Sequence, residues 1–73
     1  MKLPNLNKFS EEKKNELIAR LEKVCDCEHF IYGTFIDLDS DADIDKVLEY
    51  IDINPNADSS DIIVFTFLLR KQR

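Results

Sequence analysis

Five aspartates fall on every second position of the segment 35–46. They are Asp37, Asp39, Asp41, Asp43 and Asp45. Clustered carboxylates bind Ca²⁺ and also act as acids, bases or nucleophiles in hydrolases. As a calcium loop beginning at Asp37, the segment has Ala42 where the turn requires glycine and Leu48 where a bidentate glutamate belongs. The segment therefore does not predict a high-affinity calcium site.

The apolar stretch that ends in "DLD" resembles the nucleophile motif of the haloacid-dehalogenase phosphatases. By this resemblance Asp37 would be the nucleophile and Asp39 the acid/base. That family continues with a glycine and a hydroxyl residue, whereas Ser40 and Asp41 stand here. A chain of 73 residues is also too short to supply that fold's lysine and second acidic pair. We expect no enzymatic activity and no cofactor.

Cys25, Cys27 and His29 also lie on alternate positions. In an extended segment all three side chains would point to one side, and thiolate with imidazole is a ligand set for zinc or copper. We keep a metal site at these residues as an alternative function. The other interpretation is structural, because small buried cysteines are common. A disulfide between cysteines only two positions apart would constrain little, so we expect reduced thiols and a cytoplasmic protein.

Charge is segregated along the chain. The net charge is −5, but the segment 26–61 carries eleven acidic residues against a single base, Lys46. Such a segment disfavours nucleic acid and favours a basic protein partner. The alternative is a solvated acidic surface that keeps a small protein soluble. The predicted partner-binding residues are Asp39, Asp41, Asp43, Asp45, Glu49 and Asp52.

Two segments have the apolar spacing of amphipathic helices. The first begins at Ser10, a good N-cap, and carries an apolar stripe at Leu17, Ile18, Leu21, Val24 and Cys25. The second repeats at Ile44, Val47, Leu48 and Ile51. Ser40 followed by Asp43 has the spacing of a capping box, and Asp41 is a competing N-cap.

Two other segments have the composition of buried strands. Residues 29–37, "HFIYGTFID", are rich in aromatic and β-branched residues, and Gly33 indicates a bulge or a close backbone approach. Residues 62–69, "IIVFTFLL", are apolar on both sides and too short to span a membrane. Residues 54–61, which join the second predicted helix to the segment 62–69, are expected to be a loop.

The order helix–strand–helix–strand predicts a small two-layer α/β domain with parallel strands joined by a βαβ crossover. We expect an extended arm at 1–9, one domain at 10–70 and a basic tail at 71–73. Two strands make a poor isolated sheet, so a second subunit or a partner should complete it. The sequence thus predicts a non-catalytic, homodimeric interaction module that acts as an adaptor or inhibitor on a basic partner.

Overall fold

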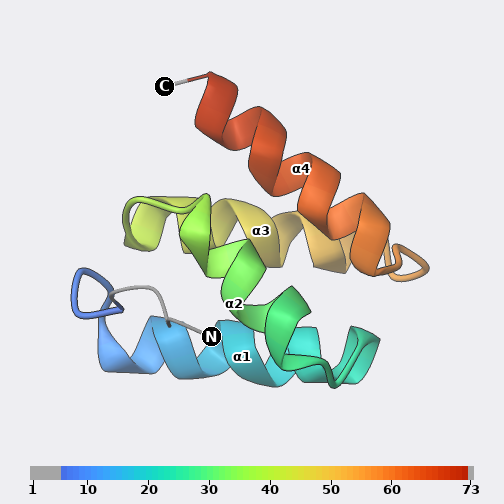
Figure 1. The fold of residues 1–73 in the computed structure, drawn as a ribbon, viewed down its shortest axis with the longest axis horizontal. Helices are drawn as coiled ribbons and strands as arrows, with labels where there is room; N and C mark the ends of the chain where they lie inside the picture. Colours follow the sequence, from blue (N-terminus) through green and yellow to red (C-terminus); the bar gives the residue numbers. More distant parts are fainter. Residues whose placement is uncertain (1–5, 73) are drawn as a thin grey trace.

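Residues 6–72, which the computed structural model describes, form four helices and contain no strand (Figure 1). The helices are α1 (Glu11–Val24), α2 (Glu28–Ile36), α3 (Asp41–Ile53) and α4 (Ser59–Lys71). The prediction of an α/β domain with parallel strands is therefore wrong, and the sheet that a second subunit was expected to complete does not exist. The two predicted helices are present as α1 and α3, whereas both predicted strands are helical.

The N-terminus of α1 is capped as the sequence predicts. The Ser10 hydroxyl accepts a hydrogen bond from the backbone N–H of Lys13 at 3.3 Å. Glu11 and Glu12 occupy the first turn and Lys23 the last, so the charges at both ends complement the helix dipole. One side of the helix is buried, with Leu17 and Leu21 fully enclosed.

Helix α3 follows the predicted N-cap, Ser40, but the contribution of the Ser40 side chain to the predicted capping box is absent. The Ser40 side chain makes no capping hydrogen bond. Instead, the Asp43 carboxylate accepts a hydrogen bond from the backbone N–H of Asp39 at 2.8 Å. The predicted apolar stripe of this helix is confirmed, since all four of its members are buried: Ile44, Val47, Leu48 and Ile51.

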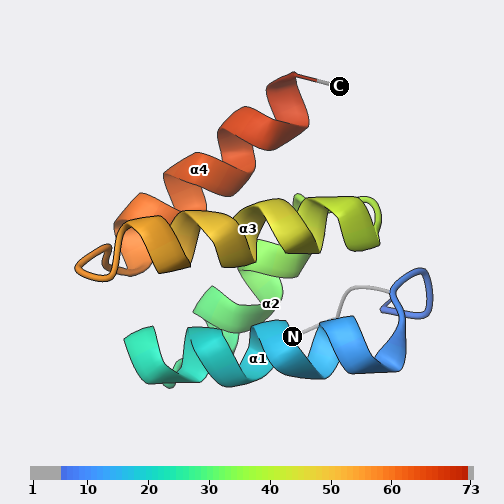
Figure 2. The ribbon, with the colours of Figure 1, turned by 180° about the vertical axis from the view of Figure 1, so that it is seen from behind.

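Helices α1 and α3 lie side by side and run in the same direction (Figure 1, Figure 2). Two ion pairs cross between them, Lys13 with Asp45 and Arg20 with Asp52. The partners in each pair are 32 positions apart. An offset that stays constant along both helices requires that they be parallel.

Helix α2 replaces the predicted strand at 29–37. It contacts α1 on one side and α4 on another, and it is apolar almost all round, as expected of a buried helix. Its buried residues include Phe30, Ile31 and Phe35. Gly33 lies within the helix, and no residue of the described chain has a positive φ. The predicted bulge at Gly33 is therefore absent.

Helix α4 replaces the predicted strand at 62–69 and begins inside the predicted loop. A complete capping box starts it: the Asp58 carboxylate accepts from the Asp61 N–H at 2.9 Å, and the Asp61 carboxylate accepts from the Asp58 N–H at 3.2 Å. Arg70 and Lys71 occupy the last turn, where positive charge is favoured.

Apolar residues from all four helices and their connections form one core. Phe9, from the predicted arm, is 6% exposed and packs against Phe35 with ring centroids 5.5 Å apart. Residues 1–5 of that arm, and Arg73 of the predicted tail, lie outside the described residues. The buried apolar residues are Phe9, Leu17, Leu21, Phe30, Ile31, Phe35, Leu38, Ile44, Val47, Leu48, Ile51, Ile62 and Leu69.

Candidate interaction surfaces

The outward side of α4 is apolar. Val64, Phe67 and Leu68 are 56%, 47% and 50% exposed. Their spacing of three and four residues places them together on one side of the helix. The opposite side is buried through Ile62 and Leu69. We refer to Val64, Phe67 and Leu68 as the α4 face.

The α4 face is exposed because α4 is an outer helix (Figure 1, Figure 2). One flank meets α2, where a Cβ added to Gly33 would lie 4.0 Å from Cδ1 of Ile63. The other flank meets α3, where Phe65 stacks on Tyr50 with ring centroids 4.3 Å apart. The C-terminal half of α4 then slants away from α3. These contacts leave the third side of the helix uncovered in the described structure.

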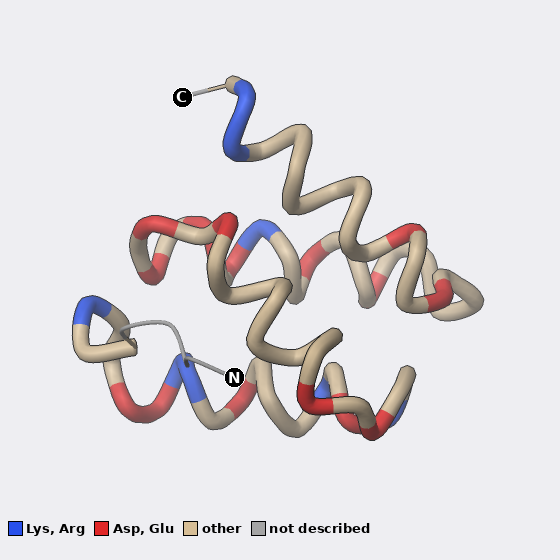
Figure 3. Tube along the Cα trace, in the orientation of Figure 1, with Lys and Arg blue, Asp and Glu red and all other residues tan. Residues whose placement is uncertain are grey.

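The two ends of α4 carry opposite charges (Figure 3). Asp58 and Asp61 stand at its start, and Arg70 and Lys71 at its end. Arg70 pairs with Asp37 at the end of α2, with Nη1 and Oδ1 3.3 Å apart. Nζ of Lys71 lies 5.3 Å from the ring centroid of Phe67, within range of a cation–π contact. The α4 face is thus bounded by acid at one end and base at the other.

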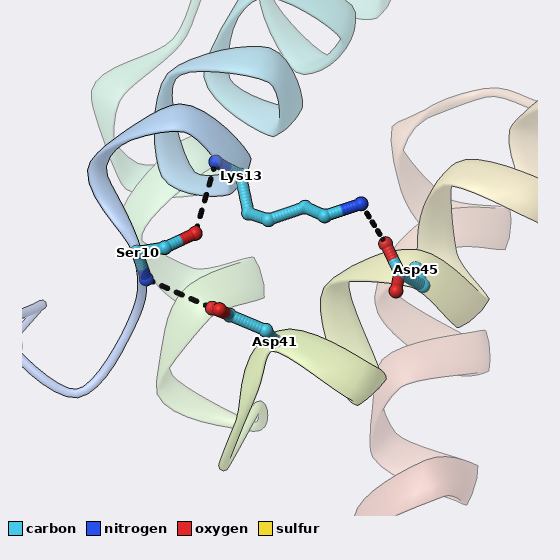
Figure 4. A network of polar contacts seen from close by, with 4 residues as sticks. All are labelled: Ser10, Lys13, Asp41 and Asp45. Carbon is cyan, nitrogen blue, oxygen red and sulfur yellow. Dashed lines mark hydrogen bonds and ion pairs between the residues drawn. The ribbon is translucent and has the colours of Figure 1, made fainter.

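The predicted partner-binding acids lie on α3 or immediately before it, and two of them contact the start of α1 (Figure 4). Oδ1 of Asp41 accepts a hydrogen bond from the backbone N–H of Ser10 at 2.9 Å. Oδ1 of Asp45 lies 2.6 Å from Nζ of Lys13. These two carboxylates therefore hold the starts of α1 and α3 together.

Three of the remaining predicted acids also have partners within the chain. Asp52 pairs with Arg20, and Oδ1 of Asp39 lies 3.9 Å from Nζ of Lys8. Asp43 is buried and binds the Asp39 backbone. Glu49 is exposed, and its side chain has no hydrogen bond or ion pair with any other described residue. The structure thus places the six acids on α3 or just before it, and all but Glu49 form hydrogen bonds or ion pairs within the chain.

Two hydrogen-bonded ion pairs shift titration in the α1 region. Asp45 accepts a hydrogen bond from the Lys13 ammonium and adds Coulombic attraction, and both raise the pKa of Lys13. Lys14 likewise donates to Glu11, and the hydrogen bond and its charge lower the pKa of Glu11. All four side chains contact water, so solvent and salt screen these interactions.

The possible metal ligands do not share one extended strand. Cys25 is the C-cap of α1, Cys27 the N-cap of α2, and His29 lies in the first turn of α2. Both cysteines are free and half-buried, whereas His29 is exposed. Within residues 6–72 no three His, Cys, Asp or Glu side chains are grouped so that they could hold a metal ion. We therefore propose no metal site here.

Shallow hollows also occur on the surface. One of about 460 Å³ lies between the starts of α2 and α4 and is lined by His29, Phe30, Ser59, Ser60, Ile63 and Val64. A second, of about 260 Å³, is lined partly by Tyr50, Ile53 and Phe65. The first combines one imidazole with two hydroxyls, and its lining includes no carboxylate to orient the imidazole as a general base.

The α4 face was missed because its residues were assigned to a strand. A signal for the helix was present in "DSSD", in which Asp58 and Asp61 have capping-box spacing. Once helical, a run that is apolar on every side must expose part of itself unless neighbours surround it. No helix among residues 6–72 is long and apolar enough to cross a membrane.

The chain matches no family model, no curated protein and no solved structure. Its function must therefore be inferred from its own surfaces.

Proposed function

We propose that this protein is a small, non-catalytic interaction module that associates with a second copy of itself through the α4 face. The observation that supports the proposal is the exposure of Val64, Phe67 and Leu68 side by side on an outer helix. Apolar residues scattered singly on a surface need no explanation, whereas adjacent ones indicate a contact site. The free thiols of Cys25 and Cys27 fit a cytoplasmic setting.

The expected strength of the dimer follows from this exposure. Fully burying a valine, leucine or phenylalanine contributes about 1.5–3 kcal/mol, so three half-exposed side chains contribute about 3.5 kcal/mol per copy and about 7 kcal/mol per pair. Association costs about 4–15 kcal/mol in lost freedom. The three side chains of the α4 face therefore leave a net gain of at most about 3 kcal/mol, which is a Kd in the millimolar range. A dimer with a Kd of about 10 μM to 1 mM requires that the surface around the α4 face be buried as well.

Sedimentation velocity over roughly 10 μM to 2 mM protein tests the proposal, because that range covers a Kd of about 10 μM to 1 mM. The apparent mass should rise from that of a monomer toward that of a dimer. Phe67→Gln should shift the transition to concentrations at least about tenfold higher, because it removes the largest apolar side chain of the α4 face.

The matched control is Ile53→Gln. Ile53 is 68% exposed but lies at the end of α3, outside the α4 face. This variant should dimerise as the wild type does, and circular dichroism should show both variants to be folded. A monomeric wild-type mass at 2 mM, or equal effects of the two substitutions, would refute self-association through the α4 face.

A second candidate function, binding of a basic partner by the acidic side of α3, is supported by the exposure of its carboxylates. Asp39, Asp45 and Asp52 keep 69%, 54% and 62% of their side chains exposed even while paired. Exposed ion pairs contribute little to stability, so the basic groups of a partner could replace the chain's own lysines and arginine beside these carboxylates. In a dimer, each copy would present this surface once, giving two linked binding sites.

Glu49 provides the sharpest test of this second function, because reversing its charge breaks no interaction within the described structure. The tagged wild-type chain should capture partner proteins at low salt. Glu49→Lys should abolish this capture, and high salt should abolish it for the wild type. Glu22→Lys, an equal charge change at an exposed position of α1, is the control and should retain them. Equal retention by both variants would remove the acidic side of α3 as a binding site.

A further inference from the structure

We infer that the two copies pair α4 against α4 in opposite directions, with Lys71 of each copy beside Asp61 of the other. This inference rests on the proposed self-association and adds the orientation and register of the pair. It follows from the order of charged and apolar residues along one side of α4.

The relevant side of α4 reads acid, apolar, apolar, base. Asp61, Val64, Leu68 and Lys71 follow one another at spacings of three, four and three residues, which keeps them on one stripe of the helix. Phe67 lies beside this stripe and is also exposed. The charged residues therefore flank the apolar ones along the direction of the helix axis.

Only one orientation makes this stripe complementary to itself. Two parallel copies of α4 in register would place Lys71 against Lys71 and Asp61 against Asp61. Two antiparallel copies place Lys71 against Asp61 at both ends of the contact. The same antiparallel register sets Val64 opposite Leu68, so the apolar contacts and the ion pairs can form at the same time. The opposed helix dipoles favour this orientation as well.

The two charged groups that this register requires are available for it. Lys71 has no carboxylate partner among the described residues, and its ammonium lies over the Phe67 ring. Asp61 uses Oδ2 in the capping box, which leaves Oδ1 for a second donor. Arg70, by contrast, already pairs with Asp37 and points toward α2.

Carbodiimide coupling of the full-length chain tests the register. Coupling joins a lysine amine to a carboxylate that touches it, and an equal mixture of ¹⁴N- and ¹⁵N-labelled protein identifies links between copies by mass spectrometry. At concentrations where the dimer forms, the expected product is a mixed-isotope Lys71–Asp61 peptide. Lys71→Arg keeps the charge but cannot form the amide, so it should dimerise normally and give no such product.

Charge reversal distinguishes the two orientations independently. In the antiparallel pair, Lys71→Glu replaces two ion pairs with two repulsive contacts and should weaken dimerisation about tenfold at low salt. In a parallel pair, glutamate would merely replace one like-charge contact with another, and the Kd should change little. At 1 M salt, where charges are screened, the variant should approach the wild type.

The outcomes separate the orientation from the underlying function. A dimer that lacks the Lys71–Asp61 product, or that is indifferent to Lys71→Glu, overturns the antiparallel register and leaves self-association standing. A wild-type chain that stays monomeric at 2 mM overturns both.

Discussion

Replacing Gly33 with alanine should stabilise the protein, because this glycine lies inside a helix that has room for a methyl group. A Cβ at this position would meet its nearest neighbour, Cδ1 of Ile63, at 4.0 Å, an ordinary van der Waals distance. The backbone there has no positive φ that would require glycine. Alanine is favoured over glycine in a helix interior by about 1 kcal/mol, so the free energy of unfolding should rise by about that amount.

Urea denaturation followed by circular dichroism at low protein concentration measures this effect without interference from dimerisation. The midpoint should rise with an unchanged m-value, and the melting temperature should increase by about 4–8 °C for a domain of this size. Gly33→Val provides the matched comparison. Valine is less favourable than alanine in a helix by about 0.6 kcal/mol, and its branches would also crowd Ile63.

The ranking of the three residues distinguishes helix from strand at this position. A helical α2 requires alanine to be the most stable of the three. In the strand that composition suggests for 29–37, valine would be the most stable. A destabilising Gly33→Ala, or a valine variant more stable than the alanine variant, would contradict a helix at Gly33.

Two further predictions concern α3 and its contacts. Asp43→Ala should lower the free energy of unfolding by about 1–2 kcal/mol, because it removes the buried carboxylate that accepts a hydrogen bond from the Asp39 N–H. Asp45→Ala removes only an exposed ion pair and should lower the free energy of unfolding far less. Equal losses for the two variants in urea titrations would contradict this difference. Because Asp45 raises the pKa of Lys13, the pair stabilises the fold at pH 7, below the unfolded lysine pKa of about 10.4, and loses that effect as pH rises through the folded pKa. The difference in melting temperature between wild type and Lys13→Met should therefore be present at pH 7 and vanish above the folded pKa; a difference that persists there would exclude the ion pair as its cause.

Helices α1 and α3 were predictable because each buries only one side. Leu17 and Leu21 in α1, and Ile44 and Val47 in α3, recur at helical spacing between solvated residues. Their starts were marked by Ser10 and Ser40, which the structure has as N-caps. In both segments the spacing of apolar residues and the N-cap residue indicated the same helix, and both helices form as predicted.

Helices α2 and α4 were mistaken for strands because neither shows a solvated side in its sequence. Residues 28–36 contact α1 and α4, so the helix is apolar in several directions and its periodicity disappears. In α4 only Thr66 interrupts the run of apolar residues, because Val64, Phe67 and Leu68 are apolar although they are exposed. Aromatic and β-branched content then favoured the strand, and tertiary packing outweighed that preference.

The alternating aspartates have a different meaning on a helix than on a strand. With about 100° between successive residues, positions two apart on a helix lie nearly opposite, and positions four apart lie together. Asp41 and Asp45 therefore both face the start of α1, where they bind Ser10 and Lys13 (Figure 4). Asp43, between them, instead binds the Asp39 backbone. The repeat that suggested a single multi-carboxylate site is thus divided between contacts with the start of α1 and a contact with the backbone that precedes α3.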